Sequence, residues 1–590
     1  MPLTFKVIFS GVLLLITLSL VSLREMDAPP AIPIQQRLVQ QADSLIISIK
    51  QFKALPVDVS HTRLMQLRFK QIRLAYKRLE WAAEYFDPLS ARQVNGPPVP
   101  EVELSGQVIQ PDGLQVMEEC LFPRFKVSDK KKLAGLVNRL AVNANEFRTF
   151  FSHVELQDWQ VFDAAKLEVF KIETQGLNNF DDPLLQNCFA ESAAALQSVN
   201  AAINHYKQAI DFGPSIRYLL RDVTFNRFDR AAFMLRFANP LTAALTSSQH
   251  RLHLFDVHYN RLLCQDAATL FNAGAFNRNA FIAALEDSAT TDKILLGKRL
   301  FNDPILSGNG SRSCASCHKP GKAFTDGLIK NLDITGKKFI TRNTPTLINA
   351  ALQPALFYDL RALSLEDQAN DVVQNPDEMH GDMKIAVGKL WQDSSYRAQF
   401  SLAYLKKDRM QIDTFEVFNA LSGYIRSLTR LNSRFDSYMR GDAKSITTFE
   451  KAGFNLFMGK AKCSTCHYLP LFNGALPPRY MQMETEVIGV PKSKNGKRID
   501  PDPGVYGITP YSFNRYAFKT TTVRNAALTA PYMHNGVFST LEEVIDFYDK
   551  GGGIGTGVAI SGQTLPADQL RLTKTEKLQL VAFIKSLNSE

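Results

Sequence analysis

Two short stretches, "SCASCHKP" at 313–320 and "KCSTCHYL" at 462–469, decide how this chain of 590 residues is organised. Each contains two cysteines that are separated by two residues, and a histidine follows directly after the second cysteine. A zinc cluster or a pair of redox dithiols would use the four cysteines but would leave the repeated histidine unexplained. Attachment of c-type haem uses every position, because the thiols bond to the porphyrin edge and the imidazole binds the iron.

The sequence therefore predicts two covalently attached haem c groups, one at each motif. The residues assigned to them are Cys314, Cys317 and His318 for haem 1, and Cys463, Cys466 and His467 for haem 2. The other cysteines, Cys120, Cys188 and Cys264, are odd in number and widely spaced. This spacing favours buried thiols over a disulfide framework, and it leaves one bridge among them open.

The N-terminal end of the chain has the pattern of an export signal. Seventeen uncharged, mostly apolar residues at 7–23 follow Lys6 and precede Arg24. Their number suits a secretory signal and is at the short end of what spans a bilayer. We therefore predict that residues 1–24 are a signal peptide or a retained membrane anchor, and that the protein is periplasmic in either case.

The composition is typical of a globular protein, with 45% hydrophobic residues and a formal net charge of +10. The densest basic cluster, "KSKNGKR" at 492–498, lies in a stretch rich in Gly and Pro. No nucleic-acid recognition motif accompanies this cluster, so we interpret it as a solvated loop and expect no nucleic-acid partner.

The hydrophobic pattern predicts a mainly α-helical fold in three blocks. Apolar residues recur at helical spacing through residues 35–280, where strand-like alternation is scarce. The stretch 94–113 must be a loop, because its paired prolines cannot continue a helix. We place a haem 1 domain at 281–445 and a haem 2 domain at 446–590, both c-type cytochrome-like with short helices and long loops. A helix bearing Gly and Phe leads up to each motif, which indicates an internal duplication.

Six motifs follow one another in a specific order from about residue 290 to the C-terminus. They are "CASCHKPGKAFTDG", "TRNTPTLINAAL", "FYDLRALSLEDQA", "NPDEM", "KCSTCH" and "FKTTTVRNAALTAPYMHNGVFSTLEE". In this half of the chain the sequence resembles the bacterial di-haem cytochrome c peroxidases and their MauG-type relatives. Residues 35–280 are weakly similar to imelysin-like helical domains, and we expect them to dock or present a partner.

The resemblance implies that haem 1 is the peroxide site, with His318 as its axial ligand and an open position opposite. Cleavage of the O–O bond needs a group that moves a proton between the two oxygens, and a carboxylate suits this task. By motif match this group is Glu378 in "NPDEM", with Gln368 as its polar neighbour. Where the family often has Trp between the haems, this chain has Tyr358, which is still redox-active.

The sequence departs from the classical members at the open face of haem 1. Those proteins close haem 1 in the resting state with a second histidine from the loop after the first motif. This chain has no histidine between His318 and His380. We therefore expect haem 1 to react with peroxide without prior reduction, and His380 to be an ordinary polar loop residue.

Haem 2 departs from the family pattern as well. The peroxidases ligate this haem with a Met, but the matching position here is Tyr548, and no Met occurs after Met533. MauG-type enzymes carry Tyr at this place. A phenolate stabilises ferric and higher oxidation states of iron, whereas a thioether favours ferrous iron. Two alternatives follow. Either Tyr548 is the second ligand of haem 2, or Tyr548 is a core aromatic residue and Met533 or His534 is the ligand.

The family also implies one Ca²⁺ between the haem domains, bound by oxygen ligands. The matching positions are the side chain of Asn343 and the carbonyls of Thr529 and Pro531.

Two functions are compatible with these motifs. The first is a di-haem peroxidase that reduces hydrogen peroxide at haem 1 with electrons passed through haem 2 from an exported cytochrome c or copper protein. The second is a MauG-like oxidase that uses peroxide equivalents to oxidise residues of a partner protein. A pure electron-transfer cytochrome is disfavoured by Glu378 and by the missing histidine cap. The sequence leaves open whether the protein is a homodimer.

Overall fold

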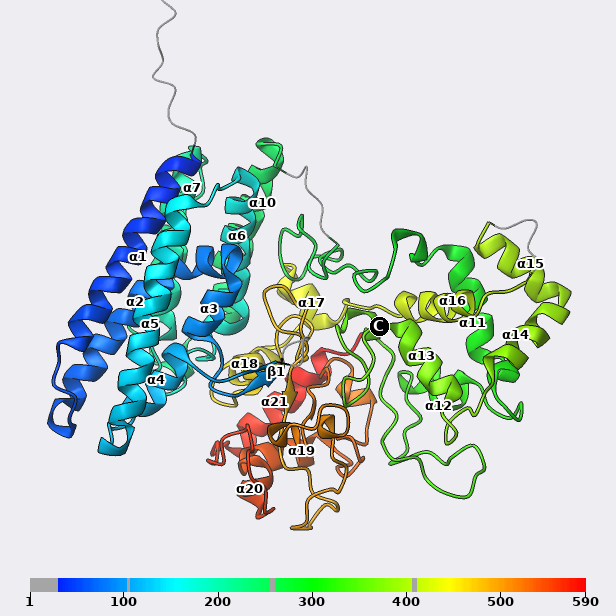
Figure 1. The fold of residues 1–590 in the computed structure, drawn as a ribbon. Coiled ribbons are helices and arrows are strands. Elements are labelled where there is room, and N and C mark those ends of the chain that lie inside the picture. The colour runs from blue at the N-terminus through cyan, green and yellow to red at the C-terminus, as the bar shows by residue number, and fades with distance from the viewer. Residues whose placement is uncertain (1–29, 103–106, 255–259, 406–410, 590) are drawn as a thin grey trace, which may run out of the picture.

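The computed structural model describes residues 30–102, 107–254, 260–405 and 411–589. The protein is mainly α-helical, as predicted, and its helices form three groups (Figure 1). The predicted export signal at 1–24 lies outside the described residues. Among the helices that are described, none is both long and apolar enough to cross a membrane.

The N-terminal group is a bundle of long helices, blue to green at the left of Figure 1. Helix α1 packs against α2 and α5, and α2 packs against α7. In α2, Met65, Phe69, Ile72 and Tyr76 recur every three or four residues, and all four are buried. The helices of this group are α1 (Ala31–Lys53), α2 (Thr62–Phe86), α3 (Pro88–Asn95), α4 (Gly113–Leu121), α5 (Lys130–His153), α6 (Asp158–Lys171), the π-helical turn Ile172–Gly176, α7 (Cys188–Ile203), α8 (Gly213–Leu219), α9 (Arg230–Phe233), the π-helical turn Met234–Ala238 and α10 (Asn239–Arg251).

The predicted loop at 94–113 connects α3 to α4. Its described part contains two short antiparallel strands, β1 (Glu101–Val102) and β2 (Val108–Ile109). The sequence pattern had not indicated this hairpin, because two paired residues per strand are too few to show alternation.

The middle group contains the first motif, and the C-terminal group contains the second. The middle helices are α11 (Thr291–Asn302), α12 (Cys314–Cys317), α13 (Leu365–Gln374), α14 (Met383–Gln392), α15 (Ser394–Ala403) and α16 (Thr414–Ser427). The C-terminal elements are α17 (Arg434–Met439), α18 (Thr448–Met458), the short turn Cys463–Thr465, β3 (Thr485–Glu486) paired with β4 (Phe518–Lys519), α19 (Leu541–Asp549), α20 (Gly552–Thr556) and α21 (Lys574–Ser586).

The middle and C-terminal groups each contain a helix crossing of the same kind. Helix α11 precedes the first motif and packs on α16, and α18 precedes the second motif and packs on α21. A Cβ at Gly297 would lie 1.9 Å from the Ala420 carbonyl oxygen, and one at Gly453 would lie 2.0 Å from that of Gln579. Only glycine permits approaches this close. The repeated crossing agrees with an internal duplication.

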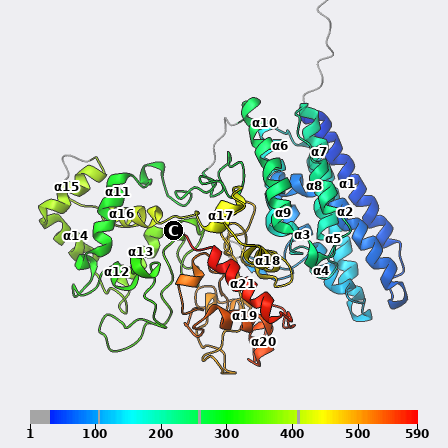
Figure 2. The same cartoon turned by 180° about the vertical axis from the view of Figure 1, so that it is seen from behind.

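Two hydrophobic cores hold the chain together. One runs without a break from the N-terminal bundle through Phe435 and Phe454 to Phe583 in α21. The other is confined to the middle group, from Leu296 to Leu428. The C-terminal group lies between the other two in Figure 1 and in the opposite view of Figure 2. The N-terminal bundle and the C-terminal group are therefore one packed unit. The predicted domain boundaries themselves remain predictions.

Candidate functional site

A cavity of about 1900 Å³ reaches both Cys-x-x-Cys-His motifs. Its walls contain every residue that the sequence assigned to a site. Besides the six motif residues, these are Glu378, Gln368, Tyr358, Tyr548, Asn343, Thr529 and Pro531. All seven cysteines of the chain are free thiols, so the four that face this cavity are available for attachment.

The first motif holds its histidine in one orientation. Helix α12 begins at Cys314, and His318 follows its last residue. The Nδ1 atom of His318 lies 2.9 Å from the carbonyl oxygen of Phe324. A carbonyl can only accept, so Nδ1 carries the hydrogen and Nε2 keeps its lone pair for a metal. Burial lowers the pKa of His318, which favours the neutral, ligating form.

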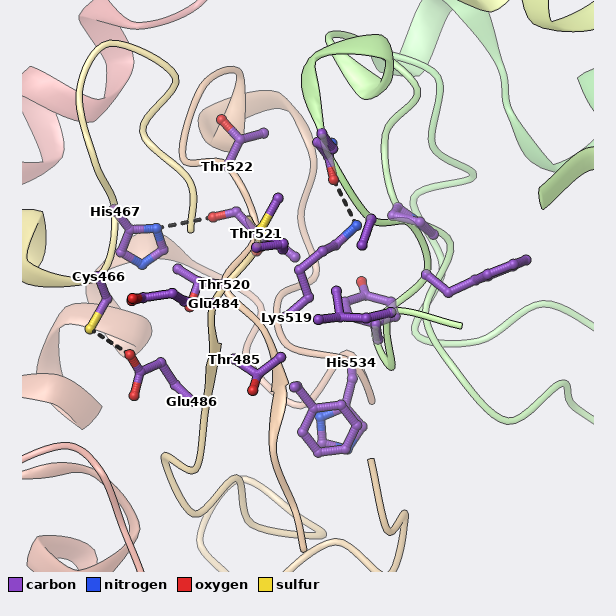
Figure 3. Close-up of a pocket in the computed structure, with 18 of the residues that line it drawn as sticks. Cys466, His467, Glu484, Thr485, Glu486, Lys519, Thr520, Thr521, Thr522 and His534 are labelled. Carbon is purple, nitrogen blue, oxygen red and sulfur yellow. Dashed lines mark hydrogen bonds between the residues drawn. The ribbon is translucent and has the colours of Figure 1, made fainter. Parts of the chain in front are cut away.

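The second motif repeats this arrangement, as Figure 3 shows. The Nδ1 atom of His467 lies 3.0 Å from the carbonyl oxygen of Thr521. Burial lowers the pKa of His467 to about 4. Two thiols and one oriented, neutral imidazole therefore face the cavity at each motif, and these residues fit two c-type haem groups.

A carboxylate lies on the wall near the first motif. Glu378 lines the cavity, and the Nδ2 atom of Asn375 donates to its Oε1 atom over 2.9 Å. Burial raises the pKa of Glu378 above its ordinary value. Gln368, on α13, lines the same wall, whereas His380 is exposed and does not. Glu378 and Gln368 thus line the same cavity as the first motif, and their role in proton transfer remains a prediction.

Tyr358 lies where the two haem-bearing groups meet. Its carbonyl oxygen accepts a hydrogen bond from the backbone N–H of Lys519 in β4 over 2.8 Å. The Nζ atom of Lys519 donates to Gln353 over 2.7 Å in the same place (Figure 3). Burial raises the pKa of the Tyr358 hydroxyl. A place for Tyr358 between the two haems remains a prediction.

Three residues were considered as the second ligand of haem 2, and all three line the cavity. The ring of His534 stacks on Phe518 with centroids 3.7 Å apart, and its Nε2 atom lies 3.2 Å from Asp500 Oδ1. These contacts engage the Nε2 atom and one ring face of His534, which disfavours it as the ligand. Tyr548 lies in the last turn of α19. Its pKa is raised, mainly by burial and further by the nearby Cys466. Tyr548 and Met533 are the stronger candidates, and the identity of the ligand remains a prediction.

The predicted calcium ligands line the cavity together. The Nδ2 atom of Asn343 donates to the Leu328 carbonyl over 2.8 Å, and its backbone N–H donates to that of His534 over 2.7 Å. Among the described residues, no three His, Cys, Asp or Glu side chains are grouped to hold a metal ion. A calcium site here would use carbonyl and amide oxygens, and it remains a prediction.

Comparison with known proteins assigns the family. A model of the di-haem cytochrome c peroxidase family matches residues 291–444. Cytochrome-c peroxidase IdrP2 of Denitromonas iodatirespirans is 31% identical over 322 residues, which are 51% of this chain and 83% of that protein. This chain belongs to the di-haem cytochrome c peroxidase and MauG family.

Further matches within the family carry both of its names. Methylamine utilization protein MauG of Methylorubrum extorquens is 35% identical over 301 residues, which are 51% of this chain and 79% of that protein. A crystal structure of a MauG-like protein associated with microbial copper homeostasis is 29% identical, with a TM-score of 0.46, and covers 52% of this chain and 92% of its own. Membership implies two haem groups and a peroxidase-type oxidoreductase.

Two residues of this candidate site were not predicted from the sequence. Lys519 lines the cavity, and burial lowers its pKa to about 8. Glu486, on β3, accepts a hydrogen bond from Cys466 Sγ over 3.1 Å (Figure 3). Lys519 lies inside the quoted motif "FKTTTVRN" and could have been noticed there. Glu486 carries no such signal.

Proposed function

We propose that this protein reduces hydrogen peroxide at haem 1 with electrons that pass through haem 2 from an exported donor. The observation that carries the proposal is Glu378, a largely buried carboxylate on the cavity wall that Asn375 holds through Oε1. When bound, haem 1 supplies the iron at which peroxide is reduced. Each peroxide takes up two electrons and two protons and leaves as two waters.

The residues of the chain would orient this chemistry and move the proton. His318 would hold the iron of haem 1 through Nε2, because the Phe324 carbonyl fixes its Nδ1. The carboxylate of Glu378 would accept a proton from one peroxide oxygen and return it to the other, which leaves as water. Gln368 would hold the bound peroxide by hydrogen bonding. Arg312 supports this wall, because its guanidinium donates to the Glu378 carbonyl over 3.3 Å.

The donor in this proposal is a small cytochrome c or copper protein, and the reaction takes place in the periplasm. The apolar stretch at 7–23 and the covalent attachment of haem support export. Calcium bound near Asn343 would brace the loops between the two haem-bearing groups.

Oxidation of a residue on a partner protein is the second candidate function. The specific observation in its favour is Tyr548 on the cavity wall near Cys466, in a chain without a Met after Met533. A phenolate at haem 2 would stabilise oxidised iron and so favour holding oxidising equivalents over receiving electrons.

Single-haem variants test the proposed route of the electrons. Cys314→Ala and Cys463→Ala should each lower the haem content from two to one per chain, measured by pyridine haemochrome absorbance and intact mass. Cys463→Ala should still react with one equivalent of peroxide in a stopped-flow experiment but should lose steady-state turnover with a reduced donor. Cys314→Ala should lose both reactions. Full turnover by Cys463→Ala would contradict electron transfer through haem 2, and two haems in both variants would end the assignment of the motifs.

A further inference from the structure

The two attachment turns differ in their exposure, although both have the pattern Cys-x-x-Cys-His. In the first motif, Ser316 is exposed and Ala315 is half-buried. In the second motif, Ser464 is 0% exposed and Thr465 is half-buried. The N-terminal bundle makes this difference, because it packs directly on the second turn and shares a hydrophobic core with the C-terminal group.

One side chain of the bundle makes the central contact with this turn. Asn178 follows the π-helical turn Ile172–Gly176 and is 2% exposed. Its Nδ2 atom lies 3.1 Å from both the carbonyl oxygen and the hydroxyl of Ser464. Its Oδ1 atom accepts a hydrogen bond from the backbone N–H of Phe180 over 3.0 Å. Both ends of the amide are therefore used, and its orientation relative to the turn is fixed.

Further contacts surround this hydrogen bond. The ring of Phe180 meets the edge of Tyr468, the residue after His467, with centroids 5.7 Å apart. Asn178 and Phe180 themselves line the haem cavity, together with residues 97–100 of the loop between α3 and α4. The bundle therefore supplies part of the haem 2 wall. Burial of the Asn178 amide without hydrogen-bond partners would cost free energy of folding, and the contacts with Ser464 and Phe180 supply those partners.

We propose that the N-terminal bundle is the cover of haem 2, and that Asn178 is the positioning residue that fixes its attachment turn, Cys463–Cys466. The cover buries Ser464 and limits the access of water and partner proteins to this turn, so a redox partner would exchange electrons with the protein at another surface. The cover also sets the reduction potential of haem 2, because solvent access and the polar groups around a haem tune it. The inference rests on the proposed attachment of haem 2 and not on the identity of the substrate.

Hydrogen exchange of the full-length holoprotein tests the cover directly. In the wild type, amides of residues 463–467 should exchange more slowly than those of residues 314–318. Asn178→Ala should speed exchange at 463–467 by about tenfold, since it removes the hydrogen bonds to Ser464, and should leave 314–318 unchanged. Ser464→Ala removes one of the two acceptors and should speed exchange less than Asn178→Ala does. The double variant should exchange only slightly faster than Asn178→Ala.

A matched control separates the turn from the domain interface as a whole. Asn239 is also buried in the bundle, and its Nδ2 atom donates across the interface to the Met439 carbonyl over 3.1 Å, away from the cavity. Asn239→Ala should change neither exchange at 463–467 nor the potential of haem 2. Asn178→Ala should lower that potential, because water gains access and favours the more highly charged ferric form.

The outcomes separate this inference from the proposed function. One outcome in the wild type is that haem is attached at Cys463 and Cys466 while the amides of 463–467 exchange as fast as those of 314–318. This result would overturn the cover and leave the proposed function untouched. Equal effects of Asn178→Ala and Asn239→Ala would overturn the role of Asn178. Absence of haem from Cys463 and Cys466, seen by mass spectrometry, would overturn the proposed function and the cover with it.

Discussion

Glu378→Gln should slow the reaction with hydrogen peroxide by at least about a hundredfold, the scale of general acid–base assistance. Glutamine keeps the size of the side chain and an oxygen for the hydrogen bond from Asn375, but it cannot accept a proton. Both haems should remain bound with unchanged spectra. The rate is measured by stopped-flow absorbance with the ferric holoprotein and peroxide in excess.

The pH profile gives this variant a signature that a structural defect would not share. Burial raises the pKa of Glu378 above 4.5, so wild-type kcat/KM for peroxide should fall as the pH drops through that raised pKa. The protonated carboxyl group, which predominates below it, cannot act as the base. Glu378→Gln should lack this acid limb. The neighbouring carboxylate Asp377, which does not line the cavity and pairs with Lys338, supplies the control variant Asp377→Asn. A near-normal rate for Glu378→Gln, or an equal loss in Asp377→Asn, would make Glu378 a bystander.

Tyr548→Met should have the largest effect on haem 2. If the phenolate oxygen binds the iron, replacement by a thioether raises the reduction potential and favours ferrous iron. Haem 1 should still react with peroxide, because His318 and Glu378 are unchanged. Oxidation of a protein substrate, if that is the activity, should fail, whereas peroxide reduction with a donor should persist. Redox titration and the absorbance spectrum of haem 2 measure the change.

Removal of the hydroxyl alone distinguishes a ligand from core packing. Tyr548→Phe should change the ferric spectrum of haem 2, and Tyr532→Phe should not. Tyr532 is a suitable control because it also lines the cavity, but its hydroxyl donates to the Ala526 carbonyl over 2.9 Å. An unchanged spectrum in Tyr548→Phe would assign Tyr548 to the core and leave Met533 or His534 as the ligand.

The haem sites could be predicted from the sequence because their chemistry is local. Two cysteines and a histidine within five residues specify attachment and ligation, wherever the surrounding chain runs. Glu378 and Tyr548 needed the order of the family motifs, because an isolated acid or aromatic residue carries no such signal. The structure brings both to the wall of one cavity with the two motifs.

The association between the N-terminal bundle and haem 2 could not be predicted in this way. Asn178 and Ser464 are 286 residues apart. Ser464 occupies a variable position of the second haem motif, and Asn178 belongs to none of the motifs quoted from the sequence. Their contact depends on how the bundle packs against α18 and its neighbours, which hydrophobic periodicity within a helix does not determine. The hairpin of β1 and β2 was missed for a different reason, because its strands are too short to show an alternating pattern.

One measurement decides whether this is a peroxidase with an open haem 1. Fully ferric holoprotein, with no reductant present, is mixed with one equivalent of hydrogen peroxide, and the Soret absorbance of both haems is followed. The missing histidine between His318 and His380 predicts immediate reaction, with loss of the ferric spectrum in the first mixing phase. A spectrum that stays unchanged until one electron per chain is supplied would show a closed haem 1 and would contradict the prediction of an open one.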